Sequence, residues 1–185
     1  VNFQGPEAGY TFFRLRPNGG TFNGNSFLNT AVHVTDGEIR TQTNSGGNDI
    51  AIGSLSGTST GVLGGGNAGT VARDNIGSLN TDTVFAGNII TGAGGIQINK
   101  VGTGTLTLSG DLTYTSTFNS VADRRGGITT VTAGTLKLVG STAIPGGIDD
   151  FVLGLLPTTV DIRAGAILDV SGTTSTYGTA DVQQV

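Results

Sequence analysis

Acidic residues between positions 149 and 163 are the side chains of this sequence best placed to do chemistry. Asp149 and Asp150 follow a Pro-Gly-Gly turn, and Asp161 and Arg163 come about a dozen residues later. Clustered carboxylates can serve as general acid and base in polysaccharide cleavage, or as Ca²⁺ ligands. Such a site requires all four side chains to meet on neighbouring strands. Aspartate is also common in solvated turns. The sequence contains no tryptophan that could stack on a sugar ring. We therefore expect no enzyme activity, and a polysaccharide-degrading enzyme remains a remote alternative.

Other catalytic and ligand-binding patterns are weaker still. His33 is the only histidine, and Val32-His33-Val34 places it on the alternate face of a strand, where a structural role is expected. The chain has no cysteine, which excludes disulfides and thiolate metal sites. The glycine runs at 64–69 and 92–95 lack the Lys-Ser/Thr of a phosphate-binding loop and the spaced Asp residues of Ca²⁺-binding glycine repeats. The sequence thus predicts no metal and no cofactor.

The composition favours strands and excludes two classes of partner. The 185 residues include 33 glycines, far above the average of roughly 7%, and only 12% are charged. The formal net charge of −4 comes without a basic stripe, so we expect no nucleic-acid binding. The longest apolar stretch, Phe151–Leu156, is too short to span a membrane. Because the sequence opens on Val1 without a secretory signal, we expect a mature product or an internal segment.

Short alternating runs separated by glycine must position all of these side chains. Thr105–Ser109 alternates aliphatic and hydroxyl side chains, as expected for strands with one buried face. Gly104, Gly134 and Gly165 lie 30 and 31 residues apart between such runs, and Gly37 occupies a similar place. We predict that these four glycines form the corners of an all-β, right-handed parallel β-solenoid with about eight rungs, because corners need positive φ or close backbone approach. A β-sandwich or propeller is the alternative.

One stretch resembles a known repeat. Lys100-Val101-Gly102-Thr103-Gly104-Thr105-Leu106-Thr107-Leu108-Ser109-Gly110, followed by Leu112–Thr115 and Gly126–Leu136, is similar to the autotransporter-associated β-strand repeat. The flanks at 52–57, 84–92 and 160–172 are similar to passenger-domain sequence of these proteins. The resemblance implies a right-handed β-solenoid in exported proteins, commonly large adhesins of Gram-negative-type bacteria. It implies no activity. The membrane barrel of an autotransporter is not in this sequence, so it lies outside the chain or the route to the surface differs.

Two parts of the chain stand apart from the repeat. Residues 1–30 hold most of the aromatic side chains and are predicted to form a cap or an interface, whereas residues 31–185 form the solenoid. Residues 116–125 are an insertion between the two halves of the repeat, and insertions of this kind project from solenoid corners. The candidate contact residues of these two parts are Tyr10, Phe12, Phe13, Phe118, Arg124 and Arg125.

The resulting functional hypothesis is a structural or adhesive segment of a large secreted or cell-surface bacterial protein. Its expected partners are copies of itself or other surface components, together with host or matrix glycans and proteins. The alternative is a self-assembling subunit of an extracellular fibre or surface layer, because the open ends of a solenoid carry unpaired backbone groups that template further pairing.

Overall fold

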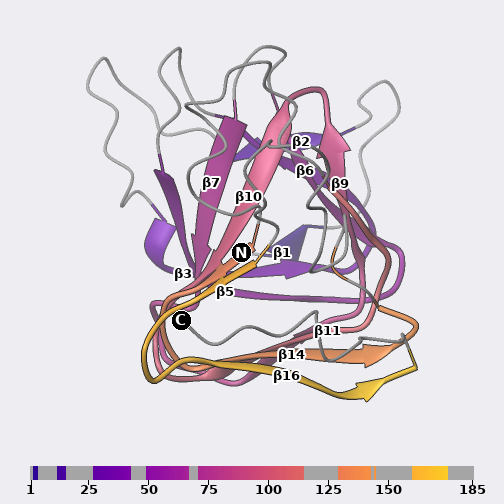
Figure 1. Ribbon diagram of the computed structural model, residues 1–185. Coiled ribbons are helices and arrows are strands. Elements are labelled where there is room, and N and C mark those ends of the chain that lie inside the picture. The colour runs from indigo at the N-terminus through magenta and orange to yellow at the C-terminus, as the bar shows by residue number, and fades with distance from the viewer. Residues whose placement is uncertain are drawn as a thin grey trace, which may run out of the picture.

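Every regular element that the computed structural model describes is a β-strand (Figure 1). The description covers residues 2–3, 12–15, 27–42, 49–66, 71–114, 129–142, 144 and 160–174. The prediction of an all-β chain is confirmed for these residues. The strands are β1 (Asn2–Phe3), β2 (Phe13–Leu15), β3 (Phe27–Val34), β4 (Gly37–Thr41), β5 (Asp49–Gly57), β6 (Gly61–Gly65), β7 (Val71–Ile76), β8 (Thr83–Phe85), β9 (Asn88–Gly92), β10 (Gly95–Lys100), β11 (Thr105–Leu108), β12 (Leu112–Thr113), β13 (Thr129–Val131), β14 (Thr135–Gly140), β15 (Val160–Ile162) and β16 (Ile167–Thr173).

The strands pair in parallel, and within the described residues no strand pairs with the next one along the chain. They form three rows. Row 1 contains β15, β13, β10, β7 and the first half of β5; row 2 contains β16, β14, β11, β8, the second half of β5, β3 and β1; row 3 contains β12, β9, β6, β4 and β2. Each pass of the chain therefore adds a strand to several rows, and hydrogen bonds join one pass to the next.

The three rows face a common interior. In Figure 1, β7 and β10 run side by side, β6 and β9 form a second side, and β11, β14 and β16 lie along a third. Side chains in register form apolar columns that run from pass to pass. Three of these columns are Ile39-Leu63-Ile89-Leu112, Phe85-Leu108-Leu138 and Leu106-Leu136-Leu168. Each fully buried aliphatic side chain contributes about 1.5–3 kcal/mol, so these columns are the main source of stability.

The four predicted corner glycines differ in backbone conformation. Gly37, Gly134 and Gly165 have φ of 79°, 66° and 81°, the left-handed region that favours glycine. Gly104 is not among the positive-φ residues, but a Cβ there would lie 2.4 Å from the carbonyl oxygen of Thr81 on the preceding pass. At this position the backbone of one pass approaches that of the next too closely for a side chain.

The register also locates extra residues in the chain. Thr113 pairs with Ile90, an offset of 23 residues, whereas Thr129 pairs with Ile98, an offset of 31. The eight additional residues must lie between Thr113 and Thr129. The predicted insertion at 116–125 falls in this interval, and its own residues lie outside the described part of the chain.

Candidate functional site

The carboxylates predicted to form a polysaccharide-cleaving site are only partly described. Asp161 of β15 forms an ion pair with Arg163, with 2.7 Å between Oδ2 and Nη2, and both side chains are partly exposed. Asp149 and Asp150 lie outside the described residues. An exposed ion pair of this kind contributes about 0–1 kcal/mol to stability.

His33 lies on β3 beside Ser56 of β5. Its Nδ1 is 2.8 Å from Ser56 Oγ, and the histidine is partly buried. The two residues are register partners on adjacent parallel strands, so their contact follows directly from the pairing. A hydrogen bond between stacked outer-face side chains explains this histidine as a structural residue.

The predicted contact aromatics near the N-terminus are described in part. Phe12 is half-buried beneath the Arg40 guanidinium, whose carbon is 3.9 Å from the ring centroid, and Arg14 lies at 5.1 Å. Phe13, the first residue of β2, is 37% exposed. Phe12 is therefore engaged by a cation within the chain. The other predicted contact residues, Tyr10, Phe118, Arg124 and Arg125, lie outside the described part of the chain.

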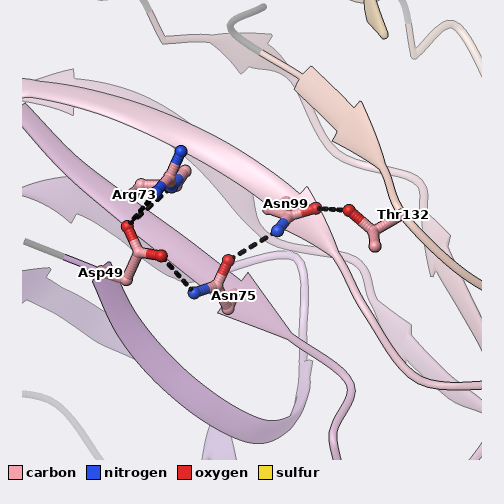
Figure 2. A network of polar contacts seen from close by, with 5 residues as sticks. All are labelled: Asp49, Arg73, Asn75, Asn99 and Thr132. Atoms are coloured by element: carbon pink, nitrogen blue, oxygen red, sulfur yellow. Dashed lines mark hydrogen bonds and ion pairs between the residues drawn. The ribbon is translucent and has the colours of Figure 1, made fainter. Parts of the chain in front are cut away.

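A ladder of polar side chains crosses the outer face of row 1 (Figure 2). Asp49 on β5 accepts bonds from Arg73 at 2.7 Å and from Asn75 at 3.1 Å, both on β7. Asn99 on β10 donates to Asn75 at 2.7 Å and accepts from Thr132, just after β13, also at 2.7 Å. The ladder thus connects four successive passes and fixes their register by side-chain bonds as well as by the backbone.

The ladder gives a testable stability effect. Asn99→Ala removes both the bond to Asn75 and the bond from Thr132, so the free energy of unfolding should fall by about 1–2 kcal/mol. Thr130→Ala is the matched control, because Thr130 is the register partner of Asn99 on β13. Denaturant unfolding of both variants measures the difference. Equal losses in the two variants would show that the ladder adds nothing beyond strand packing.

Three corner side chains repeat the same contact at one fixed interval. The side-chain oxygens of Asn80, Asp82 and Asn88 accept bonds from the backbone N–H groups of residues 103, 105 and 111, each 23 residues further along. The distances are 2.9, 2.7 and 2.9 Å. Two successive passes of the chain therefore keep one register of 23 residues around this part of their path.

Lys100, the first residue of the repeat motif, is buried in a corner, and the sequence analysis missed this. Its side chain is 1% exposed, and its Nζ donates to the carbonyl oxygens of Val101, Gly102 and Ala133 at 2.7, 2.9 and 3.2 Å. Burial lowers the pKa of Lys100, and the nearby Asp82 carboxylate opposes that shift. The signal was available, because Lys100 follows Ile96 and Ile98 in the inward phase of β10.

Asp74 is a second buried ionisable residue that the sequence analysis missed. It is fully buried in β7, in the inward phase between Ala72 and Ile76, and its Oδ2 accepts a 2.9 Å bond from Thr41 Oγ1 of β4. Burial raises the pKa of Asp74 from 3.8 to about 8; the bond from Thr41 opposes this shift and the Asp49 carboxylate adds to it. An aspartate on the apolar face of a strand was the signal that could have identified it.

The last described pass exposes part of its apolar column. Val160 and Ile162 of β15 and Leu168 of β16 are only partly buried, whereas their register partners on β13 and β14 are at most 1% exposed. Ile167, the register partner of Thr135 on the outer face, is 55% exposed. Among the described strands, β15 pairs only with β13 and β16 only with β14, so each has a described partner on one side only.

Comparisons with models of protein families, with curated proteins and with solved structures gave no match for this chain. Within the described residues, no group of three or more His, Cys, Asp or Glu side chains is placed to hold a metal ion. The same residues contain no helix with the length and apolar character needed to cross a membrane. The function must therefore be argued from the geometry of the strands, the corners and the outer faces.

Proposed function

We propose that this chain is a segment of a right-handed parallel β-solenoid in a large secreted or cell-surface bacterial protein, and that it serves as a structural or adhesive element. The observation that carries the proposal is the pairing of each strand with a strand one pass away, at offsets such as 24 residues between β7 and β10. In a solenoid this pairing builds a rod whose length grows with each pass and whose outer faces display side chains in regular rows.

The pairing favours a solenoid over a parallel barrel. A parallel barrel closes a single ring of neighbouring strands, and its strand-to-strand crossovers usually contain helices. Here consecutive described strands belong to different rows, and the columns of buried side chains run from pass to pass. The corner bonds of Asn80, Asp82 and Asn88 at one constant interval add to this support.

The outer faces support a scaffold rather than a catalytic role. The side chains of the ladder from Asp49 to Thr132 bond to one another and form a continuous polar row on this face. The described carboxylates on the outer faces include three ion-paired ones, Asp49, Asp161 and Asp169, each with an Arg or Lys partner. Polar rows of this type suit contact with extended surface glycans or proteins, which are the partners we propose.

Negative-stain electron microscopy of the native material, with its intact mass, tests the proposal. We expect short rods, or a parent polypeptide much larger than 18.5 kDa in which this segment forms part of a rod. Row 2 contains seven described strands, so at about 4.8 Å between strands this segment contributes about 30 Å of rod. A round particle whose dimensions match a closed barrel would contradict the solenoid. Binding of the rods to surface glycans or matrix proteins then tests the adhesive role.

A self-assembling fibre is the second candidate, and the half-exposed apolar column of β15 and β16 favours it. A second copy could continue this column by adding its first strands to the open edge, a contact that does not close on itself. Long fibres built from 18.5 kDa subunits would support this function. Leu168→Lys should then abolish the fibres, because Leu168 ends the column Leu106-Leu136-Leu168 and is only partly buried in the single chain.

A further inference from the structure

Asp74 stands in an otherwise apolar part of the interior. Its register partners on the neighbouring passes are Ile50 and Ile98, which are 0% and 1% exposed. The bond from Thr41 crosses the interior from row 3 to row 1 and occupies one carboxyl oxygen of Asp74. Within the described residues, the other oxygen, Oδ1, has no hydrogen-bond partner, and neither has Oε1 of Gln42, the buried residue that follows Thr41.

The charges on the packed elements do not compensate an ionised Asp74. On β5, Asp49 is a like charge, and on β7 itself Arg73 is paired with Asp49 at 2.6 Å. On β4, Arg40 is paired with Glu38, also at 2.6 Å. On β10, the ammonium group of Lys100 is taken up by three backbone carbonyls. An unpaired buried carboxylate is strongly disfavoured, and the group accepts a proton instead.

We propose that Asp74 makes the packing of the interior depend on a proton: as a neutral acid it packs between Ile50 and Ile98, and loss of its proton places an uncompensated charge there and loosens the contact between β7 and its neighbours. Protonation also turns one carboxyl oxygen into a donor, and Gln42 Oε1 is a second buried acceptor without a partner among the described residues. The contribution of Asp74 to the free energy of unfolding would then be largest at acidic pH and would fall as the pH rises.

The direction of the pH effect follows from the proton balance. The pKa of Asp74 in the folded chain is about 8, against 3.8 for an exposed aspartate, so between these values the folded chain holds a proton that the unfolded chain has released. Stability from this group is complete below pH 3.8 and is lost as the pH rises towards 8. One proton changes the unfolding equilibrium constant by up to about tenfold per pH unit.

Denaturant unfolding between pH 5 and 9 tests the proposal with Asp74→Asn and Asp49→Asn. The unfolding equilibrium constant of the parent chain should rise by about tenfold per unit up to pH 8. Asp74→Asn keeps the shape of the side chain without a titratable proton, so it should remove that slope. Asp49→Asn removes a carboxylate of the same region and should retain most of it. Equal slopes in the parent and in Asp74→Asn would overturn the proposal.

A measurement on the unsubstituted chain covers the case in which Asp74→Asn does not fold. With ¹³C-labelled aspartate, nuclear magnetic resonance follows each carboxyl carbon through its titration. One carboxyl group should titrate near pH 8, and Gln42→Leu should shift that titration if the amide oxygen accepts the proton. The proposal fails if every aspartate of the folded chain titrates below pH 6. Because both experiments probe the interior, their failure would leave the scaffold role standing.

Discussion

Lys100→Met should lower the free energy of unfolding by about 3–5 kcal/mol, one of the two largest losses expected in this chain. Methionine has a side chain of similar length to lysine but lacks the ammonium group. The carbonyl oxygens of Val101, Gly102 and Ala133 would then lose their common donor inside a packed corner. A lost bond to a charged group costs about 1.5–3 kcal/mol, and buried acceptors left unpaired add to it. The midpoint of denaturant unfolding measures the loss.

Lys137→Met is the matched control for Lys100→Met. Lys137 lies on the outer face of β14, its side chain is 38% exposed, and its Nζ is 3.4 Å from Asp169 Oδ2. Surface ion pairs contribute little, so this change should cost less than about 1 kcal/mol. Similar losses in the two variants would mean that the corner carbonyls do not depend on Lys100. The Lys100→Arg variant keeps the positive charge but changes the shape of the group that carries it. It should still be destabilised, because a guanidinium cannot occupy a site built for a compact ammonium group.

Strand content could be predicted from the sequence because alternation is a local property. Thr105–Leu108 and Thr135–Leu138 show one apolar and one polar face in the sequence, and both lie in strands with that burial pattern. The apolar residues 106, 108, 136 and 138 are at most 1% exposed. The parallel pairing was also predicted, because glycines at regular intervals indicate passes that stack on one another.

The inward phase of their strands indicates that Lys100 and Asp74 are buried, but their partners could not be predicted with the same rules. Lys100 and Asp74 occupy inward positions of strands whose other inward residues are apolar, and charged residues are rarely buried unless partners satisfy them. The partners of Lys100 include a carbonyl 33 residues away, and Thr41 lies 33 residues from Asp74. Contacts at such separations depend on the register of successive passes, which alternation within one strand does not specify.

The surroundings of Phe12, one of the candidate contact residues, also depend on the register. Phe12 was selected because aromatic residues cluster near the N-terminus, but Arg40 of a neighbouring pass covers its ring. The pairing of Phe13 with Ile39 brings these two segments together, and the sequence of either segment alone does not reveal it.

Gly134→Ala should also lower the free energy of unfolding by about 3–5 kcal/mol, because two separate penalties meet at this corner. Gly134 has φ of 66°, and an alanine in this region costs about 1–2 kcal/mol. Its Cβ would also lie 2.5 Å from the carbonyl oxygens of both Gly102 and Gly104 on the preceding pass. The backbone of one pass would have to move away from the other, with a further cost of about 1–3 kcal/mol.

Gly165→Ala separates the two penalties. Gly165 has φ of 81°, but a Cβ there has no atom within 4 Å, so only the conformational cost of about 1–2 kcal/mol is expected. The difference between the two variants in denaturant unfolding therefore measures how closely one pass stacks on the next. A loss for Gly134→Ala no larger than that for Gly165→Ala would contradict the close stacking of passes on which the proposed rod depends. A larger loss for Gly134→Ala than for Gly165→Ala, and a still larger one for Gly134→Val, would show that the steric contact lies at the Gly134 corner.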